Sequence, residues 1–433
     1  MRRVDVITLG CSKNLVDSEF LIKQFEAEGF SVEHDPSEPK GEIVVINTCG
    51  FIGDAKEESI DTILDFARAK NDGQINKLYV MGCLSERYNG QLNEELPEVD
   101  KFYGKFDWKD LITDLGYTYR PDLANERSLT TPGHYAYLKI SEGCNRKCSY
   151  CAIPVITGVH QSKPVKELVD ETRLLAQSGV KEIQVIAQDL SYYGVDLYKK
   201  QMLAPLVEEL SKIDGIEWIR LHYAYPAGFP VDVLQAMAQN PKVCAYMDIA
   251  LQHISDNMLQ KMRRFVNKEQ SINLINKMRD MVPGIHLRTT MITGHPGETE
   301  EDFRELLTFV EEARFERLGV FPYSHEEDTY AWNNYEDDVP EEIKQERANQ
   351  IMELQRGISR ELNEQKIGQT LKVIIDRKEE DYYVGRSEFD SPEVDPEILI
   401  SGDENLTVGE FYETKITGAE DYDLYGAVKV LTP

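Results

Sequence analysis

The chain has 433 residues, with 48 Lys and Arg against 77 Asp and Glu, which gives a formal net charge of −29. This length predicts about three domains, each large enough to bury its own core. The charge disfavours nucleic acid as the primary partner, because an acidic surface repels a phosphate backbone. It favours a basic protein partner, although such a charge is also typical of proteins that are simply soluble.

The sequence carries no signal for a membrane or for secretion. No apolar run reaches the roughly 18 residues that a membrane-spanning helix needs, so we expect no membrane partner. The first three residues lead into a strand-like run and not into a secretory signal, which predicts a cytoplasmic protein. Seven widely spread cysteines, an odd number, indicate metal binding or buried thiols and not a disulfide framework.

Residues 1–120 alternate short apolar runs with helical patterns, which predicts a βαβαβα domain with a parallel sheet. The expected strands are 4–9, 42–48 and 77–82, and the expected helices are 17–28, 54–70 and a further stretch after residue 83.

A cysteine follows each of these three strands, at Cys11, Cys49 and Cys83. The carboxyl ends of parallel strands share one edge of a sheet, where such folds bind ligands, so we expect the three thiols to converge. A single cysteine at such a position is more often a small buried hydrophobe. Its recurrence at three equivalent positions favours a three-thiolate site for an iron–sulfur cluster.

Residues 121–134 are rich in Pro, Asn and Gly and are interpreted as a linker. Over residues 135–367 the βα rhythm restarts and runs six times, which predicts an open three-quarter TIM barrel. A long amphipathic helix after Pro340 is expected to pack against this barrel. The expected barrel strands are 135–140, 181–187, 217–221, 246–250, 286–292 and 317–321, and the expected helices are 165–177, 203–213, 231–239, 256–264 and 300–313.

The loop after the first barrel strand carries Cys144, Cys148 and Cys151 as a C-x3-C-x2-C triplet. Three thiolates on one loop can hold three corners of a [4Fe-4S] cubane and leave the fourth iron open to a small molecule. Structural zinc is the alternative, but it normally takes four ligands, and the sequence offers no second C-x2-C or nearby H-x3-H. We therefore expect an open cluster on the carboxyl-end face of the barrel. Cys244 belongs to no motif and is expected in the core.

Residues 368–433 change to a period of two, which predicts a small all-β barrel of the OB type. The expected strands are 371–375, 382–385, 398–400, 411–416 and 427–430. Such barrels often bind nucleic acid through basic groups, but residues 369–433 hold 6 Lys and Arg against 16 Asp and Glu. A cation-rich protein surface is the expected partner of this barrel.

Taken together, these features resemble the methylthiotransferase family of the radical S-adenosylmethionine superfamily, over essentially the whole chain. The resemblance rests on the motifs LGCSKNLVDSE at 9–19, NTCGFI at 47–52, GCL at 82–84 and LKISEGC at 138–144. They are most similar to the branch that modifies a small-subunit ribosomal protein. The tRNA-modifying branch usually has a different residue pair after the first cysteine and a more basic terminal barrel. The resemblance implies a TRAM domain at residues 368–433.

The implied reaction is methylthiolation of the β-carbon of one aspartate in ribosomal protein S12. S-adenosylmethionine is implied as the methyl donor and as the source of a 5′-deoxyadenosyl radical. Two [4Fe-4S] clusters are implied: one on Cys144, Cys148 and Cys151, which binds S-adenosylmethionine, and an auxiliary one on Cys11, Cys49 and Cys83, which carries the sulfur. The implied partners are ribosomal protein S12 or the assembling ribosomal subunit, and an electron donor such as flavodoxin or ferredoxin. The alternatives are tRNA methylthiolation and a non-catalytic binding module stapled by metal.

The resemblance also implies contacts to the cofactor from strand ends, and no catalytic side chain beyond the cluster ligands. Tyr150 fits two interpretations equally well: an aromatic ring that packs against the adenine, or ordinary packing. The superfamily often has Gly-Gly-Glu after the second barrel strand, where this chain has Ala187, Gln188 and Asp189. Either Gln188 or Asp189 makes that contact, or it is made elsewhere.

Three further groups are candidates for binding the ribose, the carboxylate or the adenosine. Gln252 and His253 end the fourth barrel strand. Arg263 and Arg264 follow, although a solvated helix end is the favoured interpretation of both arginines. Gly294 and Gly297 suit a close approach of backbone to adenosine, or simply a βα turn capped by Thr299.

Overall fold

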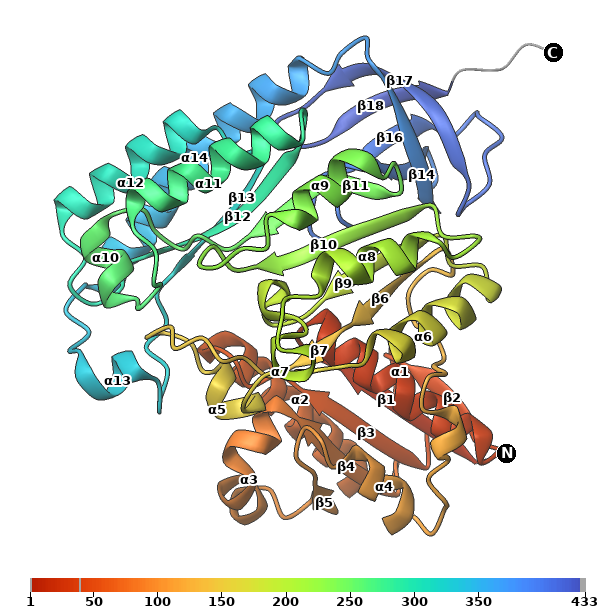
Figure 1. Cartoon of the computed structure of the whole chain (residues 1–433). Helices are drawn as coiled ribbons and strands as arrows, with labels where there is room; N and C mark the ends of the chain where they lie inside the picture. The colour runs from red at the N-terminus through yellow and green to blue at the C-terminus, as the bar shows by residue number, and fades with distance from the viewer. Residues whose placement is uncertain (1, 39, 429–433) are drawn as a thin grey trace.

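The computed structural model describes residues 2–38 and 40–428 and contains three successive sheet-based units (Figure 1). The first is a parallel sheet in the order β2-β1-β3-β4-β5. Its strands are β1 (Arg3–Thr8), β2 (Ser31–His34), β3 (Ile43–Thr48), β4 (Lys77–Gly82) and β5 (Lys101–Phe102). Its helices are α1 (Ser12–Ala27), α2 (Gly53–Asn71), α3 (Cys83–Glu95) and α4 (Trp108–Asp114). The expected parallel βα architecture is confirmed.

Two features of this sheet differ from the expectation. Helix α1 begins at Ser12 and not at residue 17, because its first turns bury polar side chains such as Asn14, which leave no apolar pattern. The sequence also did not predict the edge strands β2 and β5, which are short. Strand β2 shows only partial burial, so its composition carries little apolar signal.

The second unit is a six-stranded parallel sheet in the order β13-β12-β11-β10-β9-β6, which confirms the open three-quarter barrel. Its strands are β6 (Tyr135–Lys139), β9 (Glu182–Ile186), β10 (Trp218–Ala224), β11 (Val243–Ile249), β12 (His286–Thr293) and β13 (Arg317–Pro322). Its longer helices are α6 (Val165–Gln177), α8 (Leu203–Ser211), α9 (Asp232–Gln239), α11 (Lys268–Met281), α12 (Glu300–Ala313) and α14 (Glu341–Glu364). Short elements complete it: η1 (Pro121–Leu123), β7 (Ser141–Glu142), α5 (Ile153–Thr157), β8 (Gln161–Ser162), η2 (Leu190–Tyr192), α7 (Val195–Tyr198), α10 (Asp256–Lys261) and α13 (Tyr330–Asn334).

Helix α14 could be predicted from its apolar stripe, whereas helix α11 could not. Helix α14 packs on the barrel through Ile351 and Ile358, as its apolar stripe predicts. Helix α11 was not predicted, because it buries only Ser271, Ile275 and Met278 and is otherwise polar. A capping box between Asn267 and Gln270 starts it. None of the helices in the described residues is long and apolar enough to span a membrane.

The third unit is a closed barrel in the order β14-β15-β16-β18-β17, as expected for an OB-type module. Its strands are β14 (Thr370–Lys378), β15 (Tyr382–Ser387), β16 (Ile398–Ser401), β17 (Phe411–Ala419) and β18 (Leu424–Val428). The expected last strand at 427–430 runs in part outside the described residues.

The loop between β15 and β16 attaches this small barrel to the larger one through acidic side chains. Asp390 pairs with Arg317 at 2.5 Å, and Asp395 pairs with Arg288 at 3.4 Å. Glu393 accepts hydrogen bonds from the hydroxyls of Tyr135 and Tyr137 at 2.9 and 3.0 Å. Part of the negative charge of the terminal barrel is therefore neutralised within the chain.

Buried ion pairs join the N-terminal sheet to the central barrel. Arg127, in the predicted linker, lies between Glu19 of α1 at 2.7 Å and Glu171 of α6 at 3.1 Å. Lys139, at the end of β6, pairs with Asp17 of α1. The linker is thus anchored through a buried guanidinium, and α1 is fixed against β6.

We expect Arg127→Met to lower the free energy of unfolding by about 3–5 kcal/mol, because it leaves the buried Glu19 without its cation and leaves Glu171 with Lys163 alone, at 3.4 Å. Arg68→Met is the matched control: its partner Asp65 is exposed, so the change should cost less than about 1 kcal/mol. Urea unfolding of the metal-free variants, followed by circular dichroism, measures the difference. Equal destabilisation by the two changes would contradict a structural role for the buried pair.

Candidate functional site

The structure brings Cys11, Cys49 and Cys83 together at the carboxyl ends of the neighbouring strands β1, β3 and β4. Cys11 is the N-cap residue of α1 and is exposed, whereas Cys49 and Cys83 are buried. The pKa of Cys83 is raised to about 12, chiefly by burial; Lys105 acts to lower it, while the neighbouring Cys11 and Cys49 add to the rise. Burial also raises the pKa of Cys49, with Cys11 adding to the effect. The three thiols therefore lie within electrostatic reach of one another.

Glycines at these strand ends make the close approach possible. Gly10 has φ +94°, and a Cβ there would lie 2.7 Å from the Cβ of Cys49. A Cβ on Gly50 would lie 2.8 Å from the backbone of Cys83. Both distances are shorter than real contacts, so a side chain at either position would push the three cysteines apart.

The side chain of Asn14 connects the same strand ends through hydrogen bonds. Its amide donates hydrogen bonds to the carbonyls of Leu9 and Thr48, both at 3.0 Å. Its Oδ1 accepts a hydrogen bond from the Sγ of Cys83 at 3.7 Å. One buried side chain thus links all three segments that carry the thiols.

The second triad, Cys144, Cys148 and Cys151, lies on the loop after β7. The backbone N–H of Cys144 donates to the carbonyl of Gly158 at 3.1 Å, and that of Cys151 donates to the carbonyl of Cys148 at 3.3 Å. Burial raises the pKa of Cys144 to about 11. Burial, and then the neighbouring Cys148 and Cys144, raise the pKa of Cys151. These three thiols also form one electrostatically coupled group.

Arg264 is buried against this second triad, so the expectation of a solvated helix end is wrong for it. Its guanidinium donates to the Sγ of Cys148 at 3.2 Å and to the hydroxyl of Tyr150 at 3.0 Å. It also lies 4.2 Å from the ring centroid of Tyr225. Arg263, by contrast, lies over the ring of Tyr330 at 4.2 Å. Sequence reasoning could not separate these adjacent arginines, because only tertiary contacts distinguish them.

The two triads are neighbours. Cys83 of the first packs in one buried apolar cluster with Ala152 and Ile156, which lie one and five residues after Cys151 of the second. Helices α3 and α5, which carry these residues, contact each other, and Figure 1 shows α5 beside α3 where the N-terminal sheet meets the barrel. A substrate between the triads would therefore be close to both.

Lys105 is a buried cation near the thiols of Cys11 and Cys83 and near Glu142, which precedes the second triad in the sequence. Its ammonium is buried 3.5 Å from Asp17 and 3.8 Å from Glu142. Burial acts to lower the pKa of Lys105, but Asp17, Glu142 and the thiols of Cys83 and Cys11 raise it overall. No motif signals this residue, because its partners come from distant parts of the chain.

Two of the expected cofactor-binding residues follow β9. The amide of Gln188 donates to Glu142 at 3.1 Å, while its buried Oε1 has no hydrogen-bond partner among the described residues. Asp189 accepts from Arg146 at 2.7 Å and from the backbone N–H of Ser191 at 2.8 Å. Gln188 therefore has a free acceptor, whereas the carboxylate of Asp189 is already engaged.

The expected residues at the ends of β11 and β12 also differ in whether they are free to contact a ligand. The buried Oε1 of Gln252 and Nε2 of His253 lack hydrogen-bond partners among the described residues. At Gly294 and Gly297 the space that a Cβ would take is filled by the side chains of Lys344 and Lys261. Thr299 caps α12 through a capping box, as one of the two interpretations of this turn expected.

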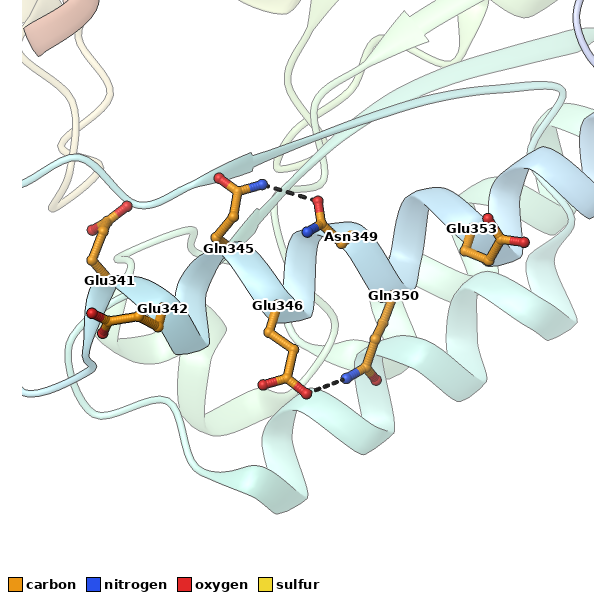
Figure 2. Close-up of a pocket in the computed structure, with 7 residues that line it drawn as sticks. All are labelled: Glu341, Glu342, Gln345, Glu346, Asn349, Gln350 and Glu353. Atoms are coloured by element: carbon orange, nitrogen blue, oxygen red, sulfur yellow. Dashed lines mark hydrogen bonds between the residues drawn. The ribbon is translucent and has the colours of Figure 1, made fainter.

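Within residues 2–38 and 40–428, no three His, Cys, Asp or Glu side chains are close enough to hold a single metal ion. A cubane cluster does not require that spacing, because each of its thiolates binds a different iron. A shallow surface depression lies elsewhere, over α14, and is lined by seven polar residues. Figure 2 shows these side chains along the helix, with Gln345 bonded to Asn349 and Glu346 bonded to Gln350. None of the candidate residues lines it.

Comparison with known families matches three segments of the chain. Residues 138–310 match the radical SAM superfamily, residues 367–428 match the TRAM domain, and residues 3–104 match the uncharacterized protein family UPF0004. Among solved structures, a radical S-adenosylmethionine methyltransferase, TsrM from Kitasatospora setae, superposes with a TM-score of 0.55 at 15% identity. That superposition covers 91% of this chain and 80% of that one, and it shows the fold alone.

Relatives with much higher identity span nearly the whole chain. The ribosomal protein uS12 methylthiotransferase RimO of Bacteroides thetaiotaomicron is 64% identical, over 99% of this chain and 98% of that protein. Its namesake from Phocaeicola vulgatus is 62% identical, over 98% and 99% of the two chains. The namesake from Christiangramia forsetii is 55% identical, over 98% and 94%.

We expect iodoacetamide to label Cys11 of the metal-free protein at pH 8 before it labels Cys83. Cys11 is exposed, whereas Cys83 is buried with its pKa raised to about 12, so little of the reactive thiolate is present at that pH. Labelling of Cys83 should accelerate as the pH rises. Cys244, buried with a pKa of about 12, is the internal reference for a protected thiol. Peptide mass spectrometry over time gives the order, and equal rates at Cys11 and Cys83 would contradict the geometry.

Proposed function

This chain belongs to the RimO family of ribosomal protein uS12 methylthiotransferases, within the radical SAM superfamily, and we propose that it modifies one aspartate of ribosomal protein uS12. In the proposed reaction a methylthio group replaces a hydrogen on the β-carbon of that aspartate. Membership of the superfamily implies S-adenosylmethionine and one [4Fe-4S] cluster. We propose a second cluster on Cys11, Cys49 and Cys83.

The adjacency of the two thiol triads is the observation that carries this proposal. A transfer of sulfur to a carbon radical needs the sulfur source and the hydrogen-abstracting group within reach of the same substrate carbon. The apolar packing of Cys83 against Ala152 and Ile156 brings the first triad next to the segment that follows the second. A purely structural metal staple in the N-terminal sheet would not need to face the barrel mouth.

The residues present fit the implied cofactors. Each triad has three thiols and can hold three corners of a cubane, leaving one iron open. The partner-free Oε1 atoms of Gln188 and Gln252 are acceptors suited to an amino group or a ribose hydroxyl. When bound, the open cluster and S-adenosylmethionine supply the radical that removes hydrogen from an unactivated carbon, which side-chain acids and bases cannot do.

The protein's own residues orient these groups and exclude water. Arg264, bonded to Cys148 and Tyr150, fixes the loop of the second triad and places positive charge beside its thiols. A hydrogen bond to a ligating sulfur is one of the levers that set a cluster's reduction potential. We propose a low-potential one-electron donor, such as flavodoxin or ferredoxin, as the redox partner.

We expect anaerobically reconstituted protein to hold about eight irons per chain and to add about 46 Da to a peptide copying the uS12 loop. The assay needs S-adenosylmethionine and a strong reductant, and mass spectrometry reads the product. The same mass increase on a tRNA nucleoside, with a steep salt dependence of tRNA binding, would replace this proposal by tRNA methylthiolation. Zinc without iron would support a metal-stapled binding module instead.

We expect Cys49→Ala to abolish methylthiolation while 5′-deoxyadenosine is still formed from S-adenosylmethionine. The reason is that this change removes a ligand of the proposed sulfur-bearing cluster and leaves the second triad intact. The control is Cys244→Ala, which removes a buried thiol in the cluster with Trp218 and Tyr246 and should leave both products unchanged. Continued methylthiolation by Cys49→Ala would assign a merely structural role to the N-terminal cysteines.

A further inference from the structure

Lys13 reaches from the N-terminal sheet into the mouth of the barrel. It is the second residue of α1 and lies two positions after Cys11 of the first triad. Its ammonium lies 3.3 Å from the ring centroid of Tyr223, at the carboxyl end of β10. Tyr223 has φ +65°, a left-handed conformation that is rare for an aromatic residue and that sets the direction of its ring. Lys13 therefore lies between the first triad and the face of the barrel where such folds place their chemistry.

Four other basic groups near the triads are already engaged. Lys105 and Lys139 each lie within ion-pair distance of Asp17 and Glu142. Arg146 pairs with Asp189, and Arg264 bonds to Cys148 and Tyr150.

Lys13 differs from all of these groups. Apart from the ring of Tyr223, it has no hydrogen bond or ion pair with any side chain that the structure describes. Its charge is nevertheless felt at the buried His222 and Asp248, deeper in the barrel. Asp248 itself has Arg288 at 3.8 Å. Lys13 is thus a partly buried cation that meets an aromatic face and, among the described residues, neither a hydrogen-bond acceptor nor a carboxylate within ion-pair distance.

An ammonium in this position is incompletely compensated. A cation over an aromatic ring gains about 0.5–2 kcal/mol, and the ring leaves the N–H donors of the ammonium without acceptors. A carboxylate arriving from solvent would supply those acceptors through short, charge-assisted hydrogen bonds. The site therefore favours an anionic group over a neutral group of the same shape.

We propose that Lys13 binds the side-chain carboxylate of the substrate aspartate and thereby selects aspartate over its neutral analogue. The inference rests on the proposed function, because it assumes that the modified residue is an aspartate. The β-carbon of aspartate is bonded directly to its carboxyl carbon. Anchoring the carboxylate on Lys13 therefore holds the carbon to be modified beside Cys11, on the side of the first triad.

The test compares two peptides copying the uS12 loop, one with aspartate and one with asparagine at the modified position, on wild type and on Lys13→Met. Methionine is unbranched and only one atom shorter than lysine, and it removes the charge together with the cation–π contact to Tyr223. For wild type we expect kcat/KM to be at least about tenfold higher with aspartate than with asparagine. For Lys13→Met we expect this preference to fall close to one, chiefly through a rise in KM for the aspartate peptide. Lys13→Arg should retain most of the preference.

Lys23→Met is the matched control, because Lys23 lies on the same helix and pairs with Glu126 near the linker. It should keep the full preference for aspartate. Iron content and the formation of 5′-deoxyadenosine without peptide check that Lys13→Met retains its clusters. If Lys13→Met loses iron, Lys13→Gln, with a neutral polar tip, provides the same comparison.

The outcomes separate the two proposals. Wild type that modifies the aspartate peptide, together with a charge-removing Lys13 variant that keeps the preference and the KM, overturns the role of Lys13 alone. Wild type that modifies neither peptide overturns the proposed substrate and this inference with it. Wild type that modifies both peptides equally well overturns carboxylate recognition while leaving methylthiolation in place.

Discussion

The pairing of buried charges between α1 and the central barrel is the constraint on which the site depends. Two ion pairs fix helix α1 against the first strand of the barrel and the segment that leads into it: Asp17 with Lys139, and Glu19 with Arg127. A buried charge without its partner is strongly destabilising, so only a narrow range of relative positions is accessible to the two units. The two thiol triads come from these different units, and their adjacency follows from how the units dock.

The acidic terminal barrel shows that the charge of a domain does not by itself identify its partner. Its loop between β15 and β16 uses Asp390 and Asp395 to bind Arg317 and Arg288 of the central barrel, and Arg386 on β15 pairs with Glu182 of β9. Asp390, Arg317, Arg386 and Glu182 are buried, and the Asp395 side chain is 1% exposed, so these groups are unavailable to a ribosomal protein. Recognition of a basic partner by this barrel would have to use its remaining exposed carboxylates, such as Glu379 and Glu413.

The sequence predicts those parts of the molecule that depend on local pattern. Apolar periodicity locates the strands that carry the cysteines, and the topology of parallel sheets then predicts that Cys11, Cys49 and Cys83 meet. Prediction from the sequence fails where polar residues are buried by partners that are distant in the chain. Helix α1 starts earlier than its pattern indicates, and Arg264 belongs to the second triad and not to solvent. Lys105 is invisible for the same reason, because its burial depends on residues 37 and 88 positions away.

The motif at residues 9–19 combines ligation, positioning and docking within little more than two helical turns. Gly10 allows Cys49 to approach, Asn14 links the strand ends, and Ser18 accepts a hydrogen bond from Asn47 at 3.0 Å. Asp17 and Glu19 attach the same helix to the rest of the molecule. Val16 packs with Tyr135 and Tyr137 of the barrel, while Lys13 lies over the ring of Tyr223. Because successive residues of a helix are separated by about 100° around its axis, one short segment can serve the sheet, the barrel and the substrate at once. A substitution within it that abolishes activity therefore does not by itself identify a residue that touches the substrate; iron content and stability must be measured with activity.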